Sequence, residues 1–195
     1  MKIKRNIKAI PERDRCQTPP YALDPLIPFL LHDARIWESC EGEGYIKKEL
    51  SQRGYDVIGS DLLHGQDYFK YQPDTWSLQV TNPPYSIKYD WLARAYQLGK
   101  PFALLMPIDV LGSARAQRMF KNKGIEIILL DKRIGFKMPQ QGWGGSPHFN
   151  TAWYTWGLEI GAPLSYGKIT PRPACQGHLL ADFYKCASPG QPRLW

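Results

Sequence analysis

Short apolar segments alternate with segments of helical periodicity along most of this chain, and glycine marks many of the joins between them. Such alternation predicts strands and helices in turn. Strands are expected at 35–40, 55–60, 78–81, 102–106, 125–130 and 151–156, and helices at 24–32, 45–53, 89–98 and 114–122. The pattern is typical of βαβ units and therefore of an α/β fold with a mostly parallel sheet and helices on both faces.

The chain has 195 residues and a net charge of +7. This length suits one domain with its own core, expected at 16–157, between a basic arm at 1–15 and a Gly- and Pro-rich extension at 158–195. The excess of positive charge favours an anionic partner, and nucleic acid is the most common one. A solvated basic face without a partner is the alternative.

No apolar stretch approaches the roughly 20 residues of a membrane span, and the polar, basic start does not resemble a signal peptide. Cys16, Cys40, Cys175 and Cys186 have no framework spacing, so free thiols in a reducing cytoplasm are expected. Cys175 and Cys186, together with His178, could be imagined as metal ligands, but no CxxC pair accompanies them. No metal site is therefore predicted.

A rigid polar turn, Asn82-Pro83-Pro84-Tyr85, follows the apolar segment 76–80. Two prolines fix φ near about −65° and remove two backbone donors, so the strand ends there. The turn offers the Asn82 amide, the Pro83 carbonyl and the Tyr85 ring at a strand's carboxyl end, where open α/β sheets bind ligands. A planar group with an NH2 would find two acceptors and an aromatic face. A proline-rich turn capped by tyrosine is the alternative.

The first predicted strand runs into the loop 38–44, which contains Glu38, Glu41 and Glu43 as well as Gly42 and Gly44. The glycines allow a sharp turn and close approach of a ligand. Three glutamates would repel phosphates, so the loop favours a cationic ligand over a nucleotide cofactor. S-Adenosylmethionine, with its sulfonium and α-amino groups, fits this requirement. An ordinary βα turn is the alternative.

Acidic residues also follow the second predicted strand. Asp61 is spaced to accept hydrogen bonds from two ribose hydroxyls. Asp67 could accept from an adenine amine while Tyr68 or Phe69 packs on the ring. The alternatives are a helix N-cap for Asp61 and a core position for Phe69.

With these segments in this order, the chain resembles the class I S-adenosylmethionine-dependent methyltransferases from about residue 18 to 157. More narrowly, it resembles the DNA adenine-N6 methyltransferases with an Asn-Pro-Pro-Tyr motif, and among them small phage-type members without a target-recognition domain. The resemblance implies a Rossmann-like seven-stranded, mostly parallel sheet whose one antiparallel strand is 151–156. It also implies a cytoplasmic location in a bacterium or a phage-infected host cell.

The resemblance assigns site residues too. The catalytic residues would be Asn82, Pro83, Pro84 and Tyr85, and the cofactor-binding residues Thr18, Pro19, Glu38, Cys40, Gly42, Gly44, Asp61, Asp67, Phe69 and Asn82. Ser39 departs from the family, in which many members have proline at this position. The missing recognition domain puts sequence-specific reading of DNA in question, but not methyl transfer.

A long loop at 132–150 is basic at its start and carries a tryptophan among glycines. Such a loop can contact phosphates and stack an aromatic ring on a base. The candidates for nucleic-acid binding are Lys88, Lys132, Arg133, Lys137, Trp143 and His148. The alternative is a hairpin whose tryptophan packs on the domain.

Three other functions remain open at this stage. Asn-Pro-Pro-Tyr also occurs in methyltransferases that act on RNA adenine and on protein glutamine, because these targets present the same kind of NH2. Protein-directed relatives usually have an additional N-terminal helical domain, for which 1–15 is too short. A catalytically silent fold that binds nucleic acid or blocks a host protein is the third. DNA is expected in preference to RNA.

Overall fold

The computed structural model describes residues 11–139, 142–145 and 149–170. Within them, seven strands form one sheet in the order β2-β1-β3-β4-β8-β5-β9. The strands are β1 (Arg35–Glu38), β2 (Asp56–Gly59), β3 (Leu78–Thr81), β4 (Phe102–Pro107), β5 (Glu126–Leu130), β8 (Thr151–Trp156) and β9 (Leu164–Gly167). β8 runs antiparallel to β4 and β5, and the other neighbouring pairs are parallel. The predicted Rossmann-like sheet with one antiparallel strand is confirmed.

The sheet extends beyond the last strand that the sequence pattern predicts. β9 lies at 164–167, in the segment expected to be an extension, and pairs in parallel with β5. The sequence pattern of this segment does not reveal the strand, because Tyr166 is 80% exposed and β9 forms the edge of the sheet. A Cβ at Gly167 would lie 2.5 Å from Pro25 Cβ, so glycine lets this edge approach the N-terminal segment.

Three α-helices agree with the predicted ones to within one or two residues: α1 (Tyr45–Gln52), α2 (Lys88–Leu98) and α3 (Ala114–Lys123). The helix predicted at 24–32 is wrong. Two 3-10 turns, Pro20–Leu23 and Ile27–Phe29, occupy this region. Pro25 and Pro28 lack the N–H groups that a continuous helix needs, so only short turns form.

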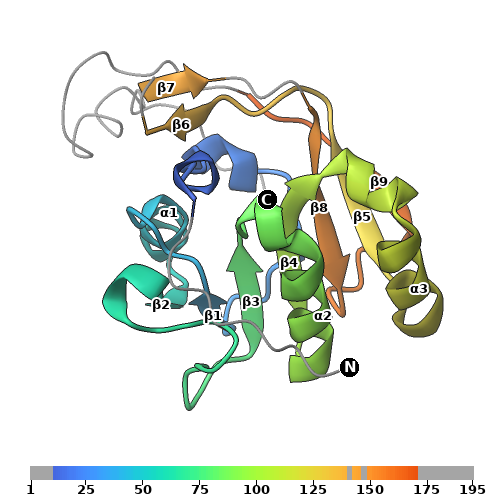
Figure 1. The fold of residues 1–195 in the computed structure, drawn as a ribbon, viewed down its shortest axis with the longest axis horizontal. Coiled ribbons are helices and arrows are strands. Elements are labelled where there is room, and N and C mark those ends of the chain that lie inside the picture. The colour runs from blue at the N-terminus through green and yellow to red at the C-terminus, as the bar shows by residue number, and fades with distance from the viewer. Residues whose placement is uncertain (1–10, 140–141, 146–148, 171–195) are drawn as a thin grey trace.

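The helices cover both faces of the sheet (Figure 1). Adjacent residues of β4 illustrate the two layers, because Leu105 packs in a core with Leu23 and Ile46, whereas Leu104 packs in a second core. The first core holds α1 and the N-terminal turns. The second holds residues of α2 and α3, including Leu92. The predicted coverage of both faces is confirmed.

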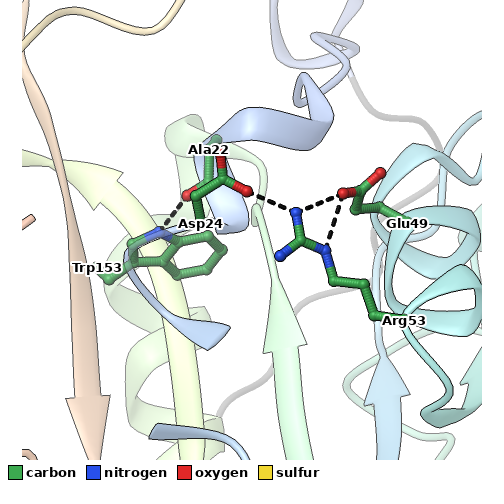
Figure 2. Close-up of polar contacts among 5 residues, drawn as sticks. All are labelled: Ala22, Asp24, Glu49, Arg53 and Trp153. Atoms are coloured by element: carbon green, nitrogen blue, oxygen red, sulfur yellow. Dashed lines mark hydrogen bonds and ion pairs between the residues drawn. The ribbon is translucent and has the colours of Figure 1, made fainter. Parts of the chain in front are cut away.

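The N-terminal turns are fixed to the domain by polar contacts (Figure 2). Trp153 Nε1, on the fully buried side chain of β8, donates to the carbonyl of Ala22 at 2.8 Å. Arg53 Nη2 lies 2.5 Å from Asp24 Oδ1 and 2.6 Å from Glu49 Oε1. These contacts tie the segment that follows Thr18 to β8 and α1.

Replacement of Arg53 by alanine is expected to lower the free energy of unfolding by about 3 kcal/mol, because it leaves a buried carboxylate without its cation. The Glu49 side chain is only 4% exposed. Arg35→Ala is the matched control, since its partner Asp56 is 66% exposed, and a loss below about 1 kcal/mol is expected. Urea unfolding measures both values, and equal losses would contradict the assignment.

A two-stranded hairpin of β6 (Phe136–Met138) and β7 (Gly142–Gly145) forms a separate small sheet. Gln17 and Lys137 exchange backbone hydrogen bonds of 2.9 and 3.0 Å, which join the N-terminal segment to β6. The hairpin therefore lies beside the carboxyl edge of the main sheet (Figure 1). In the described ranges, no helix combines the length and the apolarity needed to cross a bilayer.

Candidate active site

A cavity of about 340 Å³ lies where the carboxyl ends of β1, β2 and β3 meet. Glu38 ends β1, Asp61 follows β2 and Asn82 follows β3, and all three line the cavity. Parallel strands bring their carboxyl ends to one edge of a sheet, which explains the convergence. The volume is in the range of small-molecule sites. Other predicted residues that line it are Thr18, Cys40 and Gly42.

The lining of the cavity is mainly acidic. Five carboxyl side chains face two basic ones, Arg15 and Lys137; the five are Asp14, Glu38, Glu41, Glu43 and Asp61. This set repels a phosphate and attracts a cation. Asp14 and Asp61 add to the glutamates of the first loop, so the acidic side chains are not confined to that loop. The preference for a cationic ligand stays a prediction.

Glu38 is the most buried of these carboxyl groups, with 1% of the residue exposed. Its Oε2 accepts a hydrogen bond of 2.7 Å from the backbone N–H of Lys47. Burial raises the pKa of Glu38 well above its usual value, and the carboxylates of Glu41 and Asp61 raise it further, while the Lys47 N–H opposes the shift. A cationic ligand group would stabilise the ionised form.

The loop after β1 uses its glycines for close contacts. Gly42 has φ +55°, and a Cβ there would lie 2.7 Å from Gln17 Oε1. That amide oxygen accepts from the N–H of Glu43 at 2.9 Å. Gly44, with φ +79°, is the N-cap residue before α1 and does not line the cavity, and neither does Pro19. The missing side chain at Gly42 therefore makes room for Gln17 of the N-terminal segment, and not for a ligand.

Asp61 has a structural role in addition to its place in the cavity. Its Oδ2 accepts from Gly42 N at 2.9 Å and its Oδ1 from Leu63 N at 2.8 Å. The alternative prediction, that Asp61 is a helix N-cap, is confirmed, because Asp61 caps the 3-10 turn Leu62–His64. A carboxylate has about four acceptor sites, so this one retains capacity for ligand hydroxyls.

The predicted adenine-binding residues lie in a separate hollow of about 20 Å³. Asp67, Phe69 and Pro84 line it, and Cys40 lines both this hollow and the larger cavity. Asp67 Oδ1 accepts from Phe69 N at 3.0 Å, and the Phe69 ring packs edge-on to Trp91. The hollow holds about one water molecule, so a purine requires movement of these side chains.

The proline turn presents two unusual polar atoms. Among the described residues, neither Asn82 Oδ1 nor the Tyr85 hydroxyl has a hydrogen-bond partner, although both atoms are buried. A buried unpaired polar group costs about 1–3 kcal/mol, and such groups are uncommon except where a ligand or water completes them. The buried Asn82 oxygen is therefore available to accept a hydrogen bond from a ligand in the cavity.

Tyr85 is packed more closely than the sequence predicts. Its ring contacts that of Phe149 edge-on, with 5.6 Å between centroids, and it does not line the cavity. Burial raises the pKa of the Tyr85 hydroxyl well above its usual value, so the group is neutral. Pro83 and Pro84 are buried, which fixes the turn.

Cys40 and Thr18 have different chemical capacities. Burial raises the pKa of the Cys40 thiol well above its usual value, and Asp61 and Glu38 raise it further. The thiol is therefore protonated near neutral pH and is not an activated nucleophile. Thr18 Oγ1 is buried without a partner among the described residues and can donate to a ligand.

The N-terminal segment contributes residues that the sequence does not predict. Asp14 and Arg15 line the cavity, and Asp14 accepts from Ser86 N just after the proline turn, at 3.3 Å. Cys16 Sγ lies 3.2 Å from Met138 Sδ on β6. No spacing in the sequence indicates these contacts, since they join segments far apart in the chain. Residues 1–10 of the predicted basic arm lie outside the described residues.

Two described residues of the predicted nucleic-acid loop, Lys137 and Trp143, contact the domain. Lys137 Nζ forms an ion pair with Glu43, and its ammonium lies 5.4 Å from the centre of the Tyr45 ring. Trp143 contacts the same ring edge-on, with 4.9 Å between centroids. The alternative, in which the tryptophan packs on the domain, is the arrangement observed.

Two of the other basic candidates contact residues that neighbour each other, because Ile108 N, next to Asp109, donates to the carbonyl of Asn150 at 3.0 Å. Lys88 Nζ lies 3.3 Å from Asp109 Oδ2, and Arg133 donates to Asn150 at 3.2 Å. Lys132 is exposed, and His148 lies outside the described residues. The role of these residues in nucleic-acid binding stays a prediction.

No group of three potential metal-binding side chains occurs in the part of the chain that the structure describes. Cys16 and Cys40 are free thiols. The residues considered as metal ligands, Cys175, His178 and Cys186, lie outside the described residues.

A scan against models of protein families found no match, and neither did a search of curated proteins. Among solved structures, the chain is similar to a dimethyladenosine transferase from Plasmodium falciparum, with 13% identity and a TM-score of 0.46 over 71% of this chain. The similarity spans 62% of that transferase. A predicted O-methyltransferase from Agrobacterium tumefaciens is similar at 15% identity and a TM-score of 0.44, with 74% of this chain and 84% of that one covered. Similarity at this level carries no argument about function, which has to come from the cavity.

Proposed function

We propose that this protein transfers a methyl group from S-adenosylmethionine to the exocyclic N6 amine of adenine in nucleic acid, with DNA preferred to RNA. One observation carries the proposal. The unpaired, buried amide oxygen of Asn82 lines the same cavity as the carboxyl groups of Glu38 and Asp61. An acceptor for an amine therefore lies next to a site for a cation.

In this proposal, the acidic side chains that line the cavity bind the cofactor. Glu38 binds the α-amino group, Asp61 accepts from the ribose hydroxyls, and Thr18 donates to the methionine carboxylate through its unpaired hydroxyl. The bound cofactor supplies an electrophilic methyl group on its sulfonium. Asp67 and Phe69 receive the adenine after their hollow opens. The small volume of that hollow implies that cofactor binding rearranges residues 66–70.

In this proposal, the proline turn binds the target amine that receives the methyl group. The lone pair of an adenine amine is delocalised into the ring, which makes it a poor nucleophile. Asn82 Oδ1 and the Pro83 carbonyl accept its two N–H groups and favour a more tetrahedral nitrogen, whose lone pair then faces the methyl group. As the N–CH3 bond forms, the S–CH3 bond would break with its electron pair on sulfur, which leaves a neutral thioether. The methylated nitrogen is acidic and loses its proton to water, so no strong general base is needed. Positioning and preorganised acceptors supply the acceleration.

The target base has to leave its helix to reach Asn82, which costs a few kcal/mol. Tyr85 stacks on the displaced base in this proposal. Its ring now packs against Phe149, so the two aromatic side chains have to separate when the base enters. RNA adenine and protein glutamine present the same planar amine and are the competing acceptors.

The decisive experiment measures cofactor binding and methyl transfer separately. Calorimetric titration with S-adenosylmethionine is expected to give micromolar affinity. Incubation with labelled cofactor and duplex DNA, single-stranded DNA, RNA or protein, followed by nucleoside mass analysis, is expected to give N6-methyladenine in DNA. Cofactor binding without transfer to any acceptor would favour a silent binding protein, and absence of both would refute the proposal.

A further inference from the structure

α3 is a basic helix with a largely exposed surface. Its ten residues include no acidic side chain, and only Ala116 is buried. The basic residues are Arg115, Arg118, Lys121 and Lys123, and the last three of these are exposed. A helix with this composition attracts an anionic partner along its length.

α3 begins close to the proline turn. α2 starts three residues after Tyr85, and Arg115 of α3 forms an ion pair with Asp90 in the first turn of α2. The Arg115 guanidinium also lies 5.7 Å from the centre of the Tyr89 ring. The two helices lie side by side on the same face of the sheet (Figure 1). Arg115 therefore lies next to the first turn of α2, and α3 runs from there to Lys123, whose carbonyl accepts from Trp156 Nε1 beside the start of β4.

The cavity and α3 differ in charge. The cavity is lined by five carboxyl side chains, and the basic Lys137 beside it is already paired with Glu43. A polyanion is therefore repelled by the mouth of the cavity and gains little from the hairpin. α3 has no acidic residue that would weaken the attraction of a polyanion to the exposed side chains of Arg118 and Lys121.

We propose that α3 binds the phosphodiester backbone of the nucleic-acid substrate through Arg118 and Lys121. The helix rises about 1.5 Å per residue, so Arg118 to Lys121 spans about 4.5 Å. One strand of B-DNA has a phosphate about every 3.4 Å of helix axis, so this span matches two neighbouring phosphates. That the nucleic acid is the substrate rests on the proposed function. That α3 binds nucleic acid does not rest on it.

The test compares two double variants in the full chain. R118Q/K121Q removes two charges from α3, and R35Q/K48Q removes two charges from β1 and α1. Fluorescence anisotropy of labelled duplex DNA, and in a second arm of hairpin RNA, measures affinity from about 50 to 200 mM salt. Loss of two phosphate contacts lowers the slope of log K against log salt by about 1.8 for DNA, and the affinity at 50 mM by about tenfold to a hundredfold.

A reduced slope for R118Q/K121Q alone, with either nucleic acid, supports the inference, and the arm with the larger effect identifies the polymer. Equal slopes for both variants and the unmodified protein, or no salt-dependent binding at all, would overturn it. Calorimetric titration with S-adenosylmethionine accompanies each variant. If the cofactor does not bind but R118Q/K121Q still weakens nucleic-acid binding, the proposed function fails and the surface on α3 stands.

Discussion

Replacing Asn82 by alanine is expected to lower the turnover of methyl transfer about a hundredfold or more, the usual effect of removing one preorganised partner of the reacting group. The variant loses the acceptor that orients the target amine. Its folding should not suffer, because Asn82 Oδ1 has no partner in the described structure. Removal of an unpaired buried oxygen is expected to leave the free energy of unfolding unchanged or up to about 1 kcal/mol higher.

This combination separates a catalytic role from a structural one. Turnover with labelled cofactor and urea unfolding are measured on the same preparation. Tyr85→Ala is expected to lose about as much turnover, because the displaced base loses its stacking partner, whereas Tyr85→Phe retains the ring and most of the activity. Near-normal methylation by both alanine variants would remove the mechanism. A large loss of stability in Asn82→Ala would instead indicate a structural role.

Replacing Glu38 by glutamine is expected to weaken S-adenosylmethionine binding about tenfold to a hundredfold. A hydrogen bond to a charged group contributes about 1.5–3 kcal/mol, and the amide cannot pair with an ammonium as a carboxylate does. Glutamine keeps an oxygen for the Lys47 N–H, so the loop geometry is retained. Calorimetric titration measures the change. Glu43→Gln is the control, since its half-exposed carboxylate should alter affinity less than about fivefold.

The raised pKa of Glu38 gives this variant a second signature. Between the ordinary pKa and the raised one, the folded protein binds more protons than the unfolded chain, so stability falls as pH rises. Glu38→Gln lacks this contribution. The unfolding free energy of the variant minus that of the unmodified protein should therefore increase as pH rises across that interval. A constant difference would contradict the assignment.

Cofactor binding should have the opposite pH dependence. A cationic ligand needs ionised Glu38, so affinity is expected to rise as pH increases through the raised pKa, with release of a proton on binding. Calorimetry in buffers of different ionisation enthalpy detects this proton. Glu38→Gln should bind without the release, and identical proton release in both proteins would show that another group is responsible.

The central strands and the three strand-end residues of the cavity follow from local sequence. Apolar runs predict the strands, and each of Glu38, Asp61 and Asn82 lies at or just beyond the carboxyl end of one. Parallel pairing then places them together without further information. The roles assigned to them stay predictions, because no ligand contact tests them.

Other parts of the site depend on contacts between distant segments. Trp143 and Lys137 look like exposed candidates in the sequence, yet both contact Tyr45 of α1. The position of Asp14 over the proline turn has no counterpart in any local pattern. The same limit applies to β9, which joins the sheet through backbone pairing at its edge and therefore needs no apolar run.

The sequence by itself determined the α/β layering and the edge at which polar residues converge, because periodicity and strand direction are local properties of the chain. Only the tertiary structure decided what encloses that edge: the N-terminal segment, the hairpin of β6 and β7, and the narrow hollow around Asp67. Packing and ion pairing between remote segments set these features. The charge of α3 can be read from the sequence, but the place of its first turn beside α2 comes from the ion pair of Arg115 with Asp90.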